Sequence, residues 1–325
     1  MNIKKIDKQS GIPLIGNIAF GIVDRGSSCI QIRPISLCNM SCIFCSTDAG
    51  PKTTTHKTGY IVDPDYLIQE VNKVVEIKEE VHANIDSVGE PASYEHLTYL
   101  IQELKKNKKI YFISMQSNGT YFTKEKIDEL EKAGLNRIHL SIHSTDPEQC
   151  KELFGSQEYD INQILEVARH ISKSKIELML APVLLPNINE EEVEKLVELS
   201  KELNCKIGIQ KYEEYKFSRK PKKVKKENYY KFYKRLEAWE KKHEVKLIYK
   251  HERGEIYKGR SLEKPIEIGE RINTTILSDG WNEGQGIAAY KGRSITVKDC
   301  KAQEGDKINL KVLENKSNIY LAKRV

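Results

Sequence analysis

Three cysteines lie close together near the start of the chain. Cys38, Cys42 and Cys45 fall in the stretch LCNMSCIFCSTDAG (37–50) with the spacing C-x3-C-x2-C, and no fourth cysteine lies nearby. Thiolates are strong, soft ligands for zinc and for iron–sulfur clusters, so this spacing can bring three sulfurs around one centre. A structural zinc site commonly has a second Cys or His pair, and none is visible here. Three thiolates can instead hold a four-iron cluster and leave one iron open, and an open metal position is where substrate chemistry takes place.

The elements that must position these cysteines follow a regular rhythm. From about residue 30 to 250, short β-type runs alternate with stretches of helical periodicity, which predicts a parallel sheet with crossover helices, open or closed as a barrel. Helix starts are marked by Asp63, by Thr123 and by Asn189 with Glu192 three residues on, and Gly134 marks a helix end. In such folds functional residues collect at the carboxyl ends of the strands. The predicted strands are residues 28–36, 82–89, 110–119, 137–144, 176–185 and 206–215.

Polar motifs follow three of these strands. IDSVGEP (85–91) ends the second strand, SMQSNGT (114–120) the third and HLSIHS (139–144) the fourth. A carboxylate such as that of Glu90 suits an ammonium group, and a glycine such as Gly89 lets the backbone approach a ligand closely. Each motif also suits an ordinary turn, because Gly, Asn and Pro are turn residues.

The cysteine cluster and these motifs, taken in order, resemble the radical S-adenosylmethionine (SAM) superfamily over about residues 28–215. The resemblance implies an α/β fold with a partial (β/α)6-type barrel and a [4Fe-4S] cluster held by Cys38, Cys42 and Cys45. In that family SAM chelates the open iron. An electron from a donor such as flavodoxin or ferredoxin then cleaves SAM to methionine and a 5′-deoxyadenosyl radical. The chain is therefore expected to be an enzyme with these two cofactors.

The same resemblance assigns individual contacts to SAM. Gly89 and Glu90 match a Gly-Gly-Glu-Pro type motif that binds the ammonium group of SAM, although Val88 replaces the first glycine. Phe44, directly before the third cysteine, is expected beside the adenine. His143 is a weak candidate for facing the substrate, because a lone strand histidine is more often structural. Polar contacts to SAM are expected from Ser117, Asn118 and Ser141.

The character of the sequence changes after the stretch 251–265, which is rich in Gly, Pro and charge and is typical of a linker. Short alternating strands and Gly-rich turns then predict a small all-β barrel. We therefore expect two domains, a core at 1–255 and a barrel at 265–325. The barrel resembles the TRAM domain, an OB-like fold of several tRNA-modifying enzymes, which implies RNA binding. Its candidate RNA contacts are Arg271, Trp281, Tyr290, Lys291 and Arg293.

A basic segment precedes the barrel. Residues 216–226, KFSRKPKKVKK, hold seven basic residues of eleven. Such a run is ordinarily a solvated loop, but here it lies between the expected catalytic core and the barrel, where its charge can hold backbone phosphates. The candidate contacts are Arg219, Lys220, Lys222 and Lys223.

The composition narrows the setting. With 39% hydrophobic and 31% charged residues, the 325-residue chain is expected to be globular and soluble. It has no run of about 18 apolar residues that predicts a membrane-spanning helix, and no recognisable signal peptide. Seven cysteines at unequal spacing do not suggest a disulfide framework and favour a reducing, cytoplasmic compartment. The net charge of +6 permits a nucleic-acid partner without demonstrating one.

These features lead to three hypotheses. The first is a radical SAM enzyme that modifies RNA, with a tRNA nucleoside as the expected substrate. The second is the same core acting on a peptide or a small metabolite, with the barrel structural. The third is a non-enzymatic, zinc-containing RNA-binding protein.

One further resemblance bears on the reaction. CIFCSTDAG (42–50) is similar to the radical SAM adenine methylases of rRNA and tRNA, which use a second, catalytic cysteine near the C-terminus. Cys300 is the nearest candidate here, although it lies in the predicted barrel, and methylation therefore stays open.

Overall fold

The computed structural model describes residues 1–249 and 256–325. The chain divides into two compact units, each built from separate stretches of sequence. The first comprises Met1–Leu37, Thr54–Ile113 and Arg253–Val325, and the second comprises Cys38–Thr53 and Ser114–Glu252. The predicted linker at 251–265 falls partly on residues outside the described ranges, and the division into domains at 1–255 and 265–325 stays a prediction.

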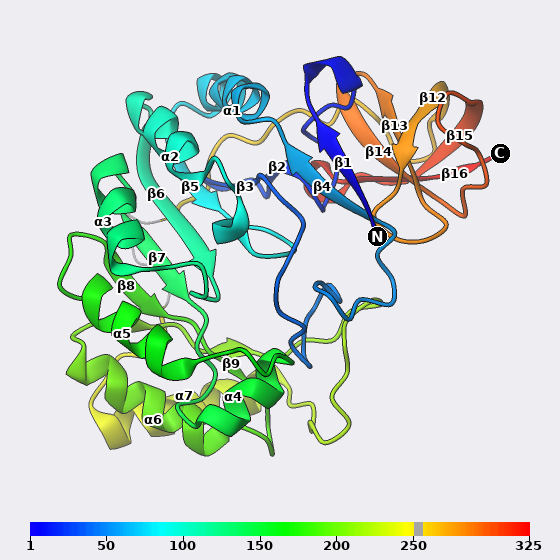
Figure 1. The fold of residues 1–325 in the computed structure, drawn as a ribbon. Helices are drawn as coiled ribbons and strands as arrows, with labels where there is room; N and C mark the ends of the chain where they lie inside the picture. The colour runs from blue at the N-terminus through cyan, green and yellow to red at the C-terminus, as the bar shows by residue number, and fades with distance from the viewer. Residues whose placement is uncertain (250–255) are drawn as a thin grey trace. The chain divides into compact units, whose positions relative to one another are not determined.

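The first unit contains two groups of strands besides its barrel (Figure 1). β1 (Asn2–Ile6) lies parallel to β4 (Thr58–Val62), whereas β3 (Cys29–Arg33) pairs in antiparallel fashion with β2 (Gly21–Asp24) and in parallel with β5 (Val81–Ile85). The helices of this unit are α1 (Pro64–Lys78) and α2 (Leu97–Lys106). The apolar residues of β3 and β5 are fully buried, as expected of strands at the centre of an α/β fold. β3 ends shortly before the cysteine stretch, and β5 ends shortly before the Gly-Glu-Pro motif.

The barrel occupies the C-terminal part of the first unit and is closed by five strands. They are β12 (Arg271–Asp279), β13 (Gly286–Tyr290), β14 (Arg293–Lys298), β15 (Lys307–Glu314) and β16 (Tyr320–Arg324), paired in the order β12-β13-β14-β16-β15. Alternate residues of these strands fill a core of Ile, Leu, Val and Ala side chains. The prediction of a small all-β barrel is therefore confirmed.

The barrel is hydrogen-bonded to N-terminal segments of its own unit. The carbonyl of Gly16 accepts from the Tyr320 N–H at 3.0 Å, and the carbonyl of Trp281 accepts from the Lys57 N–H at 2.8 Å. A Cβ at residue 16 would lie 2.0 Å from the carbonyl oxygen of Ser294, so only glycine permits this close approach. These contacts integrate the barrel into the unit.

The second unit contains parallel strands of its own. β6 (Ile110–Ser117) enters it from the first unit and pairs with β7 (Arg137–Leu140), which pairs with β8 (Glu177–Leu180), and β8 pairs with β10 (Lys206–Ile207). Two short strands, β9 (Val183–Leu184) and β11 (Gln210–Lys211), pair with each other beyond the ends of β8 and β10. The helices are α3 (Lys124–Ala133), α4 (Pro147–Phe154), α5 (Ile161–Ile171), α6 (Glu190–Glu202) and α7 (Tyr229–His243).

The predicted helix boundaries have mixed outcomes. Asp63 and Thr123 accept hydrogen bonds from the N–H groups of the third residue on, and Gly134 ends α3 in the left-handed conformation, so these three predictions are confirmed. The helix start at Asn189 is also confirmed, because Asn189 is the N-cap residue of α6, but its side chain makes no cap hydrogen bond. The side chains of Asn189 and Glu192 instead bind the backbone at strand ends.

No helix in the described part of the chain is both long and apolar enough to cross a membrane.

The buried ion pair between Lys78 and Asp24 gives a testable consequence. The two side chains are 0% and 1% exposed and 2.8 Å apart, and Lys78 also donates to the carbonyl of Arg260. We expect Lys78→Met to lower the free energy of unfolding by about 3–5 kcal/mol, because it leaves a buried carboxylate without its cation. The control in the same helix is Lys73→Met, whose side chain is 70% exposed and whose loss is expected to cost under about 1 kcal/mol. Equal losses in denaturant titrations would contradict this account.

Candidate functional site

The three cysteines lie in one loop of the second unit, and each is half-buried. The thiol of Cys38 accepts from the Met40 N–H at 3.4 Å, and that of Cys45 accepts from the Ala49 N–H at 3.3 Å. Burial, with smaller contributions from the charges of Cys38 and Cys45, raises the pKa of the Cys42 thiol well above its ordinary value. The sulfurs are thus within electrostatic reach of one another, and a bound cationic centre would relieve their repulsion as thiolates.

The loop is fixed against the C-terminal end of α4. Ser41 and Ile43 donate their N–H groups to the carbonyls of Phe154 and Leu153 at 2.9 and 3.0 Å. Gly155 follows the helix with φ +63°, and a Cβ there would lie 2.2 Å from the carbonyl oxygen of Ser41. The loop and the helix end therefore meet at residue 155, where only a glycine fits.

Arg219 binds the loop through its guanidinium group and its backbone N–H. Its Nε lies 2.7 Å from Asp48 Oδ1, while Nη1 donates to the carbonyl of Cys42 at 3.2 Å and Nη2 to that of Asp48 at 3.1 Å. Its own N–H donates to the carbonyl of Cys45 at 2.8 Å. The guanidinium predicted to contact RNA phosphate is engaged with the cysteine loop instead. Arg219 is the one arginine among the lysines of residues 216–226, and its planar, multidentate guanidinium is the signal that could have suggested a structural role.

Asn39, which sequence reasoning missed, links the loop to the end of β6. Asn39 Oδ1 accepts from Asn118 Nδ2 at 3.0 Å, and Asn39 Nδ2 donates to Thr120 Oγ1 at 2.8 Å. Asn118 Oδ1 also accepts from the N–H of Thr120 at 3.0 Å, and the Ser117 carbonyl accepts from the Ser141 N–H at 2.8 Å. The structure thus places Ser117, Asn118 and Ser141 together at neighbouring strand ends.

Phe44 and His143 are in contact. Phe44 belongs to a buried apolar cluster with Leu153, Leu185 and Tyr212, and its ring lies edge-on to that of His143, with centroids 4.8 Å apart. His143 Nδ1 accepts from the Val183 N–H at 3.1 Å. Burial lowers the pKa of His143 to about 3, so the ring is neutral at physiological pH.

Asn189 and Glu192 organise the backbone beside this pair. Asn189 donates to the carbonyl of His143 at 2.8 Å and accepts from the Leu185 N–H at 2.8 Å. The Glu192 carboxylate accepts from Ser144 and Thr145. Burial alone would raise the pKa of Glu192, but hydrogen bonds from Lys195, Thr145 and Ser144 lower it to about 2. The charged carboxylate therefore fixes the turn after β7.

Gly89 and Glu90 lie in the first unit and pack on the residue that directly precedes Cys38. The Glu90 N–H donates to the Leu37 carbonyl at 2.7 Å, and a Cβ at Gly89 would lie 2.1 Å from the same oxygen. Glu90 is 2% exposed, and its carboxylate accepts from the Ala92 N–H at 2.9 Å. The glycine is thus required by a close approach of two backbone segments.

Most of the RNA contacts predicted on the barrel interact with other residues of the first unit. Trp281 is 8% exposed and its ring lies 4.3 Å from that of His56, so it offers no free face to a base. Lys291 pairs with Glu270 at 2.8 Å, and Arg293 donates to the carbonyls of Gly292 and Glu263. Tyr290 packs partly on the barrel core, and Arg271 is exposed.

Cys300 lies in the same barrel, half-buried, after β14. Its thiol faces the carbonyl of Ala302 at 3.7 Å, and a Cβ at Gly286 would lie 2.9 Å from the sulfur. A catalytic role for this cysteine stays a prediction.

The cysteine loop has the chemistry of a cluster site. It offers three thiols, two of which already accept backbone N–H groups, as sulfurs bound to iron commonly do. Within residues 1–249 and 256–325, no three His, Cys, Asp or Glu side chains converge as one metal ion would require.

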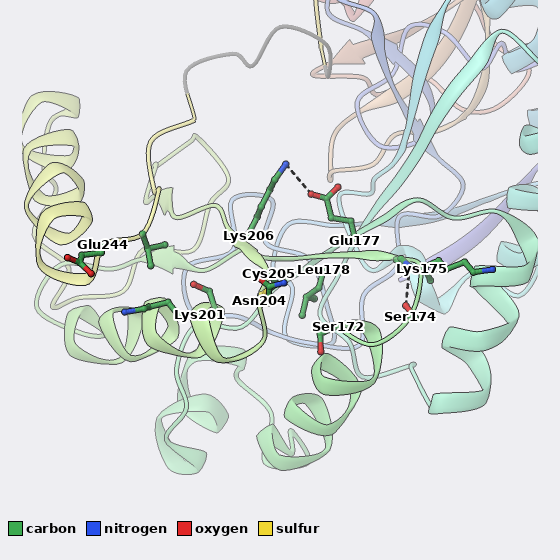
Figure 2. A pocket seen from close by; sticks show the side chains of 13 residues that line it. Ser172, Ser174, Lys175, Glu177, Leu178, Lys201, Asn204, Cys205, Lys206 and Glu244 are labelled. Atoms are coloured by element: carbon green, nitrogen blue, oxygen red, sulfur yellow. Dashed lines mark hydrogen bonds and ion pairs between the residues drawn. The ribbon is translucent and has the colours of Figure 1, made fainter.

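A cavity of about 590 Å³ in the second unit contains none of the predicted site residues (Figure 2). It lies at the amino ends of β8 and β10, where Lys206 pairs with Glu177 at 3.1 Å. Functional residues of parallel α/β folds collect at the opposite strand ends, so this cavity is not the candidate site.

The contact between Gly155 and the cysteine loop can be tested by substitution. We expect Gly155→Ala to lower the free energy of unfolding by at least about 2 kcal/mol more than Gly11→Ala. Gly11 has nearly the same backbone angle, φ +66°, but a Cβ there would meet nothing within 4 Å. The control therefore measures the left-handed strain alone, about 1–2 kcal/mol. Equal losses in the two variants would show that the loop does not press on residue 155.

The neutral His143 predicts a pH dependence. Unfolded histidine gains a proton near pH 6.5, whereas the folded residue resists protonation down to about pH 3. The wild type should therefore lose free energy of unfolding as the pH falls through this window, approaching about 1.4 kcal/mol per pH unit, relative to His143→Phe. Parallel curves for the two proteins in denaturant titrations between pH 7 and 4 would contradict the buried, neutral assignment.

Comparisons with known proteins agree with this geometry. The family model of the radical SAM superfamily matches residues 32–200. The uncharacterised protein MJ0103 of Methanocaldococcus jannaschii is 39% identical over 97% of this chain and 79% of its own length. A GTP 3′,8-cyclase of Desulforamulus reducens is 28% identical over 55% of this chain, and the match spans only about half of the cyclase, 54%.

A solved structure shares the fold. Streptococcus suis SuiB bound to S-adenosylmethionine aligns with 74% of this chain and 51% of its own, at a TM-score of 0.54 and 16% identity. The family match covers just over half of the sequence and includes the three cysteines. The chain belongs to the radical SAM superfamily, enzymes whose cofactors are S-adenosylmethionine and a [4Fe-4S] cluster.

Proposed function

We propose that this radical SAM enzyme modifies RNA, with a tRNA nucleoside as its substrate. The observation that carries the proposal is the attachment of the basic segment 216–226 to the cysteine loop. Arg219 in the middle of this segment is hydrogen-bonded to the carbonyls of Cys42 and Cys45. An RNA backbone held by the neighbouring lysines would thus be bound to the same segment that contacts the cysteine loop.

The cysteine loop would hold the cluster through Cys38, Cys42 and Cys45. The cluster and SAM, when bound, supply the reductive cleavage that generates a 5′-deoxyadenosyl radical. The chain's own contribution is to fix the loop through Asn39, Gly155 and Arg219, and to donate N–H groups to two of the sulfurs. Such hydrogen bonds tune the reduction potential of a cluster.

The individual contacts to SAM that the family resemblance implies are part of this proposal. Glu90 would take the ammonium group, Ser117, Asn118 and Ser141 the polar groups, and Phe44 the adenine. Support for this comes from the packing of Gly89 and Glu90 against the residue before Cys38, and from the bond that joins Asn118 to the cysteine loop through Asn39.

The remaining details of the first hypothesis belong to the same proposal. The reduced cysteines suit a cytoplasmic setting, and a small electron-transfer protein such as flavodoxin or ferredoxin would reduce the cluster. The resemblance of the barrel to a TRAM domain supports an RNA substrate, although Trp281, Lys291 and Arg293 are engaged within the first unit.

A second candidate is a radical SAM enzyme that acts on a small metabolite or a peptide. The hydrogen bonds that join Gly16 to Tyr320 and Lys57 to Trp281 favour it, because they give the barrel a structural part. The name of the GTP 3′,8-cyclase indicates that this partial relative acts on a free nucleotide. Both candidates share the cluster and the SAM site and differ only in substrate.

The cluster assignment predicts different outcomes for two cysteines. After anaerobic reconstitution, Cys42→Ala is expected to lose the absorption of the cluster and to release no 5′-deoxyadenosine from SAM, because one of three thiolates is missing. Cys300→Ser, at a half-buried cysteine of the barrel, is expected to retain both. Iron and sulfide analysis and chromatography of the SAM products give the result. Full iron content in Cys42→Ala would contradict the assignment.

The substrate is tested by mass spectrometry of nucleosides. Transfer RNA from cells that lack the gene is expected to miss one modified nucleoside, and the purified enzyme with SAM and a reductant should restore it. An unchanged nucleoside profile, together with normal SAM cleavage by the purified protein, would favour the second candidate.

A further inference from the structure

The second unit exposes an unusual number of aromatic rings in one part of the chain. Tyr215 and Phe217 are 59% and 37% exposed, and Tyr229, Tyr230 and Tyr233 on α7 are 56%, 71% and 45% exposed. Large aromatic side chains normally bury most of their surface, so five exposed rings within nineteen residues need an explanation.

These rings are grouped in space. Tyr229 and Tyr233 are stacked with centroids 6.2 Å apart, and the Tyr229 hydroxyl is hydrogen-bonded to the carboxylate of Glu213, two residues before Tyr215. Tyr230 and Tyr233 are three residues apart on α7 and therefore share a helix face. Tyr215, Tyr229, Tyr230 and Tyr233 thus form one set, here called the tyrosine surface.

Positive charge accompanies the tyrosine surface. Lys211 Nζ lies 4.8 Å above the ring of Tyr229, and Lys234 Nζ lies 5.9 Å from that of Tyr230. Residues 215–226 contain no acidic residue, and Lys220, Lys222 and Lys223 are exposed. Glu213 and Glu214 lie just before this stretch and are paired with Lys211 and Lys226. The net charge of the region is therefore strongly positive.

The chain between the tyrosines is fastened to the cysteine loop and its apolar neighbours. Arg219 binds the loop, Val224 packs against the apolar cluster that contains Phe44, and the Tyr212 hydroxyl donates to the Arg219 carbonyl at 3.3 Å. These apolar and charged anchors hold the segment, while its lysines remain exposed.

We infer that the tyrosine surface and the lysines of 216–226 form a single-stranded RNA-binding platform, on which unpaired bases stack. This rests on the proposed RNA substrate and adds where the unpaired part of that substrate is held. Base stacking on exposed aromatic rings with a flanking cationic track is how proteins bind single strands without reading sequence. The lysines alone would suffice to bind an acidic protein partner, whereas the four exposed tyrosines are explained by base stacking.

The platform is tested with the full-length, reconstituted enzyme and two probes, a labelled single-stranded oligouridylate and bulk tRNA. Tyr230→Ala and Tyr233→Ala are expected to weaken oligouridylate binding by roughly 5-fold or more each. The matched control is Tyr99→Ala, since Tyr99 is also helical and 41% exposed but lies on α2 of the first unit. Alanine is a good helix former, so all three variants are expected to fold, which circular dichroism verifies.

A charge variant adds a second readout. The double variant Lys222→Gln/Lys223→Gln is expected to reduce the slope of log affinity against log salt by about 1.4, because each lost phosphate contact of a single strand contributes about 0.7. The matched control is Lys105→Gln/Lys106→Gln, at two exposed lysines in the last turn of α2 of the first unit, and it is expected to leave the salt slope unchanged.

The outcomes separate this inference from the proposed function. Wild-type affinity in both tyrosine variants, with RNA binding intact, would overturn the platform and leave the RNA substrate standing. Slower cluster reduction by flavodoxin in these variants, without a change in RNA affinity, would also overturn it in favour of a protein partner. A wild-type enzyme that binds neither probe at low salt would overturn the RNA substrate and the platform together.

Discussion

A single arginine holds together the part of the molecule on which the rest of the account depends. Arg219 binds the side chain and carbonyl of Asp48 and the carbonyls of Cys42 and Cys45, so the cysteine loop cannot adopt its conformation independently of the segment 216–226. Bidentate, charge-assisted contacts of a guanidinium are directional as well as strong, and a lysine cannot reproduce them. The loop is held at two further points, by Gly155 after α4 and by Asn39 at the end of β6.

The expected cluster ligands and the proposed RNA-binding surface belong to one unit. The thiols, Phe44, His143, Arg219 and the tyrosine surface all belong to the second unit, whereas the barrel belongs to the first. Three of the RNA contacts predicted on the barrel, Trp281, Lys291 and Arg293, contact other groups of the first unit. The proposed recognition of RNA therefore rests mainly on the surface attached to the cysteine loop, and the barrel contributes stability to the first unit through backbone hydrogen bonds.

Sequence periodicity predicted β3, β5, β6, β7, β8 and β10, most helices and the small barrel, because local propensity and burial agree in those regions, but it missed β1, β2 and β4. The spacing of the three cysteines and the order of the motifs after the strands located the candidate site residues. The sequence could not predict that Asn189 and Glu192 bind strand ends rather than cap α6, since the competing partners, His143 and Thr145, are over forty residues away. It did not predict the partners of Arg219 and Trp281, because a basic or aromatic residue in a polar stretch carries no signal of the distant loop or ring that contacts it. The pairing of β1 with β4 was missed for the same reason.

We expect the three thiolates of the cysteine loop to leave one iron of the cluster open for SAM. Electron paramagnetic resonance of the reduced, reconstituted enzyme, recorded with and without SAM, tests this most directly. We expect the spectrum of a [4Fe-4S] cluster that changes when SAM is added, because SAM becomes a ligand of the open iron. A spectrum identical in the presence and absence of SAM, from protein with full iron content, would show that every iron already has its ligands and would contradict the account.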